Sequence, residues 1–202
     1  MSPSALEFCV LGIGHLAAAV RVQLPLFGLA TPADLAEACG ARRLLLACSD
    51  YASASSFADV NRRAVRDRCA ILFAWISSGR IEVGPLVVPL ESPCFECQLP
   101  RRSDFSLIQI GTTSRFTSGA GGATLNPDTR LKSVASFGAL LVARELSGIR
   151  FGARSARLIG RVAKFDPPCI DPEITQLSRT ADCPVCGRAP HGIPANHPTG
   201  PQ

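Results

Sequence analysis

The sequence predicts an α/β protein built on a mostly parallel sheet with helical crossovers. Three observations support this prediction. Short apolar runs alternate with helix-like stretches over about the first 90 residues, as expected where buried parallel strands alternate with helices. A glycine-rich turn follows the first apolar run, and two Cys-x-x-Cys pairs lie in the second half of the fold. Together these features indicate a nucleotide-binding type of sheet that carries a tetra-cysteine metal site.

Apolar runs bounded by turn residues mark the expected strands, because buried parallel strands are nearly continuous in apolar residues. The run EFCVL is the first, VQLPL a brief second, and LLLAC a third, and the later runs are equally apolar apart from an interruption at Pro85. The expected strands are Glu7–Leu11, Val22–Leu26, Leu44–Cys48, Ala70–Trp75, Ile81–Leu90 and Leu158–Phe165.

Helical spacing of apolar residues and local start and stop signals mark the expected helices. The first opens in GIGHLAAAV, where alanine and leucine dominate. In the second, Pro32 suits the first turn and Gly40 the end, and Gly148 suits the C-cap of the last. The expected helices cover 12–20, Pro32–Cys39, Ser55–Cys69 and Leu131–Leu146.

The composition predicts one folded domain. Of 202 residues, 47% are hydrophobic, which is enough for a single core. We expect one domain over 1–187, with a nucleotide-fold half over about 5–90 and a zinc and crossover half over 91–187. The polar segment 100–128, rich in Gly, Ser and Thr, predicts a long mobile loop, and 188–202 predicts a disordered tail. No run approaches the ~20 apolar residues of a membrane span, and no signal peptide is evident, so a cytoplasmic location is expected.

The formal charge of +5 is mild, but arginines cluster at two places. They read as a solvated helix face and a loop, or alternatively as a contact surface for an acidic peptide or nucleic acid. With one Trp and one Tyr there is no interleaved aromatic pattern, which argues against nucleic acid. The clustered residues are Arg62, Arg63, Arg66, Arg68, Arg101 and Arg102.

Four of the nine cysteines form the two pairs, Cys94 with Cys97 and Cys183 with Cys186. Four soft thiolates match tetrahedral zinc, and a closed four-sulfur site leaves no position for a reacting water. The alternatives are a redox pair and unliganded buried thiols. The other cysteines read as small core residues, except for one in the loop PPCID; they are Cys9, Cys39, Cys48, Cys69 and Cys169.

The turn LGIGHLA fits the form G-x-G-x-x-G/A with Gly12, Gly14 and Ala17. It follows a strand and opens a helix, where backbone amides can cradle a phosphate. A dinucleotide site also needs an acidic residue at the end of the second strand, and residues 26–28 are Leu-Phe-Gly. His15, inside the turn, is expected to be a surface or capping residue.

The order LLLACSD, FADVNRRAV, IEVGPLVVP, SPCFECQ, FDPP and DCPVCG resembles the ThiF and ubiquitin-activating-enzyme superfamily. Asp50 after its strand and Asn61 on the next helix fit that order. The phrases VNRRAV and GPLVVP are most similar to the ThiF-like proteins of bacteriocin cyclodehydratases. The resemblance implies a truncated Rossmann-like sheet of ThiF type, a structural Zn²⁺ ion and a homodimer. It also implies a YcaO-type cyclodehydratase as partner, with the leader of a precursor peptide as ligand.

Departures from the superfamily predict that this chain is not catalytic on its own. The stretch from Val22 to Leu44 contains no lysine for ATP, and no cysteine between Cys97 and Cys169 could form a thioester. The chain begins at its first strand, so a winged-helix leader clamp is expected either to be missing or to lie on another polypeptide. One alternative is an ATP-dependent adenylating enzyme, with Gly12, Gly14, Ala17 and Asp50 holding nucleotide and magnesium. The other is a zinc-stabilised binding module with unrelated partners.

Overall fold

The structure is a computed structural model that describes residues 7–23, 29–30, 43–51, 54–77, 79–101, 127–150, 157–167 and 171–187. The expected helix Pro32–Cys39, residues 102–126 of the glycine-rich segment and the tail 188–202 lie outside the described residues. So do Cys39 and Cys169. The expected domain limits therefore stay a prediction.

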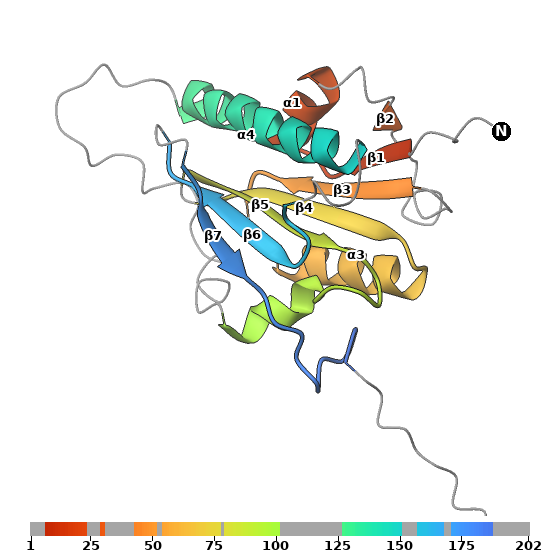
Figure 1. The fold of residues 1–202 in the computed structure, drawn as a ribbon. Coiled ribbons are helices and arrows are strands. Elements are labelled where there is room, and N and C mark those ends of the chain that lie inside the picture. Colours follow the sequence, from red (N-terminus) through yellow and green to blue (C-terminus); the bar gives the residue numbers. More distant parts are fainter. Residues whose placement is uncertain are drawn as a thin grey trace, which may run out of the picture.

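A seven-stranded sheet organises the chain in the order β2-β1-β3-β4-β5-β6-β7 (Figure 1). The strands are β1 (Glu7–Leu11), β2 (Leu29–Ala30), β3 (Arg43–Ser49), β4 (Ala70–Ser77), β5 (Arg80–Val87), β6 (Arg161–Phe165) and β7 (Glu173–Gln176). The described helices are α1 (His15–Gln23), α3 (Ala54–Arg66), α4 (Pro127–Arg150) and the 3-10 helix η2 (Phe95–Arg101).

The sheet has a parallel half and an antiparallel half. Strands β2, β1, β3 and β4 pair in parallel, and α1 and α3 are their described crossover helices. From β4 onward, each neighbouring pair is antiparallel. The α/β class is confirmed, and the sheet is mixed because the chain turns directly from β4 into β5 instead of crossing over.

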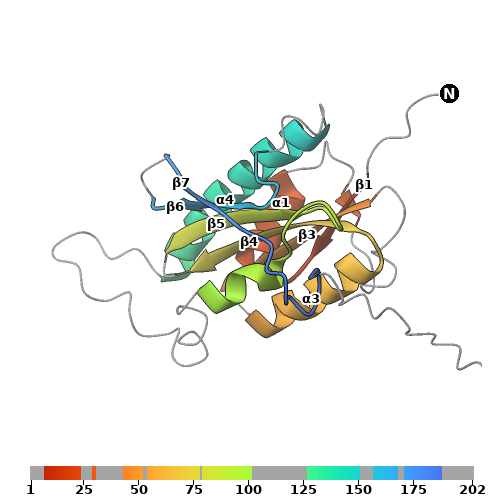
Figure 2. The ribbon, with the colours of Figure 1, turned by 60° about the horizontal axis from the view of Figure 1, so that its bottom comes forward.

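Helices cover both faces of this sheet, which explains why its central strands are apolar throughout. Figures 1 and 2 show α1 and α4 on one face and α3 with η2 on the other. Side chains of β3 alternate between the two cores: Leu44 and Leu46 join the cluster under α1 and α4, whereas Leu45 and Ala47 join the cluster under α3. The sheet is therefore the middle of three layers, with a helical layer packed on each of its faces.

Two helix and strand limits differ from the expected ones, and one strand was missed. Val22 belongs to α1, which continues to Gln23 because no helix breaker follows its alanine-rich start, and the second strand is Leu29–Ala30 instead. Gly148 lies inside α4, which runs on to Arg150. The polar strand β7 was missed because its four side chains are all exposed and show no apolar alternation. No described helix is long and apolar enough to span a bilayer.

Gly148 lies inside α4 with a helical backbone, and it is not among the described glycines with positive φ. Gly148→Ala should therefore raise the free energy of unfolding by about 0.5–1 kcal/mol, since alanine loses less backbone entropy in a helix. Urea unfolding of both proteins measures this change. A loss of stability would instead place Gly148 in a left-handed cap.

Candidate functional site

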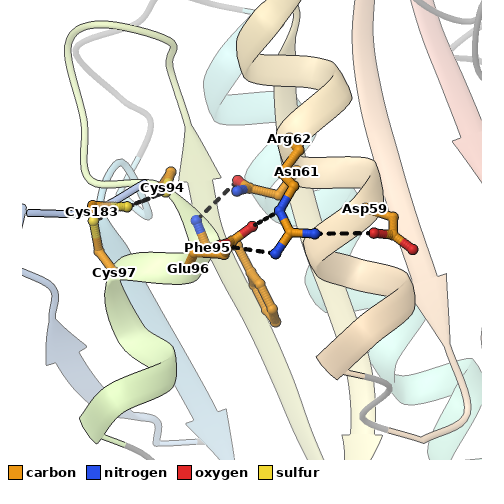
Figure 3. Close-up of polar contacts among 8 residues, drawn as sticks. All are labelled: Asp59, Asn61, Arg62, Cys94, Phe95, Glu96, Cys97 and Cys183. Atoms are coloured by element: carbon orange, nitrogen blue, oxygen red, sulfur yellow. Dashed lines mark hydrogen bonds and ion pairs between the residues drawn. The ribbon is translucent and has the colours of Figure 1, made fainter. Parts of the chain in front are cut away.

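The structure brings the four predicted metal ligands together. The sulfur atoms of Cys94, Cys97, Cys183 and Cys186 all lie within 4.8 Å of one another, and all four thiols are free. Cys94 Sγ is 3.9 Å from Cys97 Sγ and 3.6 Å from Cys183 Sγ, and Cys97 Sγ is 3.3 Å from Cys186 Sγ. Figure 3 shows three of these side chains converging from η2 and from the C-terminal segment.

These distances suit a single tetrahedral ion. Sulfur ligands about 2.3 Å from a tetrahedral zinc ion lie about 3.8 Å from one another. Three of the four cysteines are buried and Cys186 is half-buried, so the protein itself encloses the site. The donor set is all-sulfur, which favours soft metals over magnesium or calcium. The four cysteines could therefore hold a metal ion, and a four-sulfur shell would be closed to substrate.

Each pair sits in a tight turn made by its own backbone. The N–H of Cys97 donates to the carbonyl of Cys94 over 3.2 Å, and the N–H of Gly187 donates to the carbonyl of Cys183 over 2.9 Å. A Cβ at Gly187 would lie 2.5 Å from that same carbonyl oxygen. Glycine is therefore needed where the second turn closes.

The thiols differ in how readily they ionise. Burial raises the pKa of Cys94 and raises that of Cys186 to about 11. Burial acts on Cys97 too, but hydrogen bonds from the Thr180 backbone and the neighbouring thiols outweigh it and lower the pKa of Cys97 to about 7. A lowered pKa favours the thiolate form of Cys97, which is the form that binds a metal.

Helix α3 and the core hold the first cysteine pair independently of any metal. Phe95, between the two cysteines, donates its backbone N–H to Asn61 Oδ1 over 3.0 Å, and Arg62 Nε lies 2.8 Å from Glu96 Oε1 (Figure 3). The Phe95 ring also packs against three aromatic rings of the core, those of Phe57, Phe73 and Trp75. This turn is therefore preorganised by the fold.

The segment with Cys183 and Cys186 has a different kind of support. The attachments that precede it include strand β7, the buried Leu177, whose N–H donates to the Gly160 carbonyl over 2.8 Å, and a 3.0 Å hydrogen bond from Arg179 Nη2 to the Ser92 carbonyl. Strand β7 pairs with β6 along Arg161 to Lys164, and the side chains of β7 are exposed. The four sulfurs are thus a main link between this segment and the core.

The glycine-rich turn meets Asp50 at the carboxyl ends of β1 and β3. The N–H groups of His15 and Leu16 donate to the Asp50 carboxylate over 2.6 and 2.7 Å. A Cβ at Gly14 would lie 2.4 Å from Asp50 Oδ2, and one at Gly12 would lie 2.0 Å from the Cys48 carbonyl oxygen. Both glycines have positive φ, so the close approach of the turn to β3 requires them.

Asp50 therefore occupies the place where a phosphate would be expected. The first amides of α1 are the donors that a nucleotide phosphate would use, and here a carboxylate caps them. Ala17 faces the core and is buried, so it takes no part in the turn. Arg21, which the sequence did not single out, donates to the carbonyls of Val10 and Gly12 over 3.2 and 3.0 Å.

Carboxylates neutralise much of the arginine cluster on α3. Arg62 pairs with Asp59 as well as Glu96, and Arg63 and Arg66 both pair with Asp67. The hydrogen bond from Arg63, together with the positive charge of Arg66, lowers the pKa of the Asp67 carboxyl. This pairing favours the interpretation as a solvated helix face.

No family model and no curated protein matches the sequence. Among solved structures, a heterocyclase in complex with substrate and cofactor has a TM-score of 0.63 at 20% identity, and the heterocyclase TruD has 0.60 at 20% identity. E. coli MccB, described as a microcin C7 biosynthetic enzyme, has a TM-score of 0.60 at 15% identity. The chain therefore shares the fold of these proteins, as the sequence resemblance predicted.

The match covers most of this chain but only part of its neighbours. It takes in 91% of this chain in each case, and 26%, 28% and 66% of the heterocyclase complex, TruD and MccB respectively. At these identities the likeness establishes the fold alone. The shared fold therefore accounts for the sheet and its helices, while the role of the cysteines and of the turn must be argued from this chain.

Metal removal tests the unequal support of the two cysteine pairs. Treatment with a strong chelator should expose residues 171–187 to limited proteolysis while the segment through η2 stays protected, because the contacts of α3 with Phe95 and Glu96 and the packing of the Phe95 ring support the first pair without a metal. Fragment masses measure the cut sites. Cys183→Ser should give the same digest, and Cys69→Ser, a buried thiol outside the cluster, should not. Early cleavage within η2 would contradict this view.

Asp50→Ala tests the role of the carboxylate as a helix cap. Removing its two hydrogen bonds should lower the free energy of unfolding by about 0.5–2 kcal/mol, as for other N-cap losses. Denaturant unfolding measures it. Asp59→Ala, which removes an exposed carboxylate from α3, should cost less than about 0.5 kcal/mol. Equal losses of unfolding free energy in the two variants would show that Asp50 does not stabilise α1 as an N-terminal cap.

Proposed function

We propose that this chain is a non-catalytic, ThiF-like partner protein in the biosynthesis of a ribosomally made peptide natural product. In this role it presents a precursor peptide to a YcaO-type cyclodehydratase and activates that enzyme, in the cytoplasm. The YcaO-type enzyme uses ATP to convert Cys, Ser or Thr residues of the precursor into azolines. This chain contributes binding surfaces and no reacting group.

The observation that carries the proposal is the contact of Asp50 with the amides of α1. A carboxylate in the phosphate cradle adds a negative charge and uses the donors that ATP would need. The fold around it is kept, with buried central strands and a complete set of four cysteines. A retained fold with a filled nucleotide site is what a partner protein descended from an adenylating enzyme would have.

The metal of this proposal is a structural Zn²⁺ ion. Four thiolates at tetrahedral spacing are the donor set that zinc prefers in closed sites. Cys94, Cys97, Cys183 and Cys186 would hold it, and it would stabilise the folded chain without taking part in chemistry.

The proposed partners rest on the solved structures that share this fold and on the sequence resemblance. Structures of the same fold include a heterocyclase with substrate and MccB with the peptide MccA. We extend this to peptide recognition by the present chain, with the leader bound directly or through a separate winged-helix protein. Pairing into a homodimer is part of the same proposal.

The second candidate is an ATP-dependent adenylating enzyme that acts on a peptide or carrier-protein carboxylate. It is favoured by the same fold in MccB with AMPCPP and MccA, at a TM-score of 0.61 and 15% identity. Gly12, Gly14 and Asp50 lie together, as that function requires. Asp50 would then have to leave the α1 amides and turn to a bound magnesium ion.

Reconstitution separates the two candidates. A YcaO-type enzyme encoded at the same locus is assayed on its precursor with and without this chain, and azolines are counted by loss of water in the mass spectrum. Leaving the chain out should reduce modification by about tenfold or more, equivalent to about 1.4 kcal/mol of docking energy. A folded Asp50→Ala variant should restore modification as well as the wild type does.

Pyrophosphate exchange supplies the opposing result. The partner proposal expects no carboxylate-dependent exchange with ATP in the presence of the precursor. Exchange that disappears in Asp50→Ala would establish the adenylating enzyme instead. Unchanged cyclodehydration without this chain, together with no retention of enzyme or precursor in a pull-down, would refute the partner role.

A further inference from the structure

Asn61 is a buried amide that lies between α3 and the first cysteine pair. It has no exposed surface, whereas the residues on either side of it, Val60 and Arg62, are partly or largely exposed. Figure 3 shows its side chain directed from α3 toward the turn that carries Cys94 and Phe95. A buried amide in an amphipathic helix is costly unless its polar atoms are bonded, so both of its ends need an explanation.

The hydrogen bond to Phe95 fixes which way the amide points. A backbone N–H can only donate, so the oxygen of Asn61 must face Phe95, which it does at 3.0 Å. The amide nitrogen then faces away from Phe95. It makes no full hydrogen bond to any residue that the structure describes.

The side chain of Asn61 lies beside the thiol of Cys94, the residue that directly precedes Phe95 (Figure 3). A thiol is a weak acceptor, which fits the incomplete bond, whereas a metal-bound thiolate is a stronger one. The nitrogen is therefore placed beside an atom that becomes its acceptor when a metal binds.

We propose that Asn61 is a positioning residue of the metal site, which donates its side-chain N–H to the metal-bound sulfur of Cys94 and holds the turn through Phe95. Four thiolates and a divalent ion together carry a net charge of −4 + 2 = −2. Such charge in a buried site is stabilised by N–H donors, and partners of this kind tune metal affinity. The inference concerns metal binding alone and does not depend on the function proposed above.

Metal affinity and ligand spectra test this role in the full chain. Asn61→Leu removes the donor at similar size and should weaken zinc binding by about 10–100-fold in competition with a chromophoric chelator. It should also shift the sulfur-to-metal charge-transfer band of the cobalt-substituted protein. Ser55→Leu places the same residue on an exposed position of α3, away from the first cysteine turn, and should leave both readouts as in the wild type. Wild-type affinity and an unshifted band in Asn61→Leu would overturn the proposal.

A measurement on the unaltered protein decides the case if Asn61→Leu does not fold. With the NMR-active isotope of cadmium in the site, a through-bond correlation is expected between the metal and a side-chain amide proton of Asn61. The β protons of the four cysteines serve as the internal control. A spectrum that shows the cysteine correlations and none to Asn61 would remove the proposed hydrogen bond.

Discussion

The convergence of four sulfurs from two distant segments is the constraint on which the rest of the structure depends. Cys94 and Cys183 are 89 positions apart, yet their sulfur atoms lie 3.6 Å from each other. The contact brings the end of the fold back to the turn after β5, across the antiparallel half of the sheet. An ion that binds all four thiolates would restrict the unfolded chain over this long loop and stabilise the native one.

The two sides of this link are not equivalent, and the difference has a structural cause. Consecutive residues of α3, Asn61 and Arg62, contact consecutive residues of the first turn, Phe95 and Glu96. The Phe95 ring is fixed in an aromatic cluster of the core. The second turn follows an edge strand with exposed side chains. The fold therefore provides one rigid half of the metal site, and the C-terminal segment completes it.

The sequence was sufficient for the chemistry-bearing residues because their spacing is distinctive. Two Cys-x-x-Cys pairs predict one four-sulfur site, and Gly12 and Gly14 predict a tight turn before a helix. It was insufficient for features set by tertiary contact. Only the register of β1 against β3 places Asp50 on the α1 amides, and only the folded chain shows that Asn61 spans α3 and η2. The polar strand β7 and the helical conformation of Gly148 were missed for the same reason. Local propensity does not show which tertiary contacts a segment makes, and these contacts determine its structure.

Both conspicuous motifs are saturated by contacts within the chain. The glycine turn is closed by Asp50, and the cysteine cluster has the donor count of a closed site, so neither offers an open position for a reacting molecule. The same turn in an adenylating enzyme must leave its amides free for phosphate, and a carboxylate at 2.6 Å from the His15 nitrogen excludes that while it stays. Release of Asp50 would remove the N-terminal cap of α1 and leave the Asp50 carboxylate without its two hydrogen-bond donors. A stable helix cap and an open nucleotide site therefore exclude each other at this turn, because both need the same amides of α1.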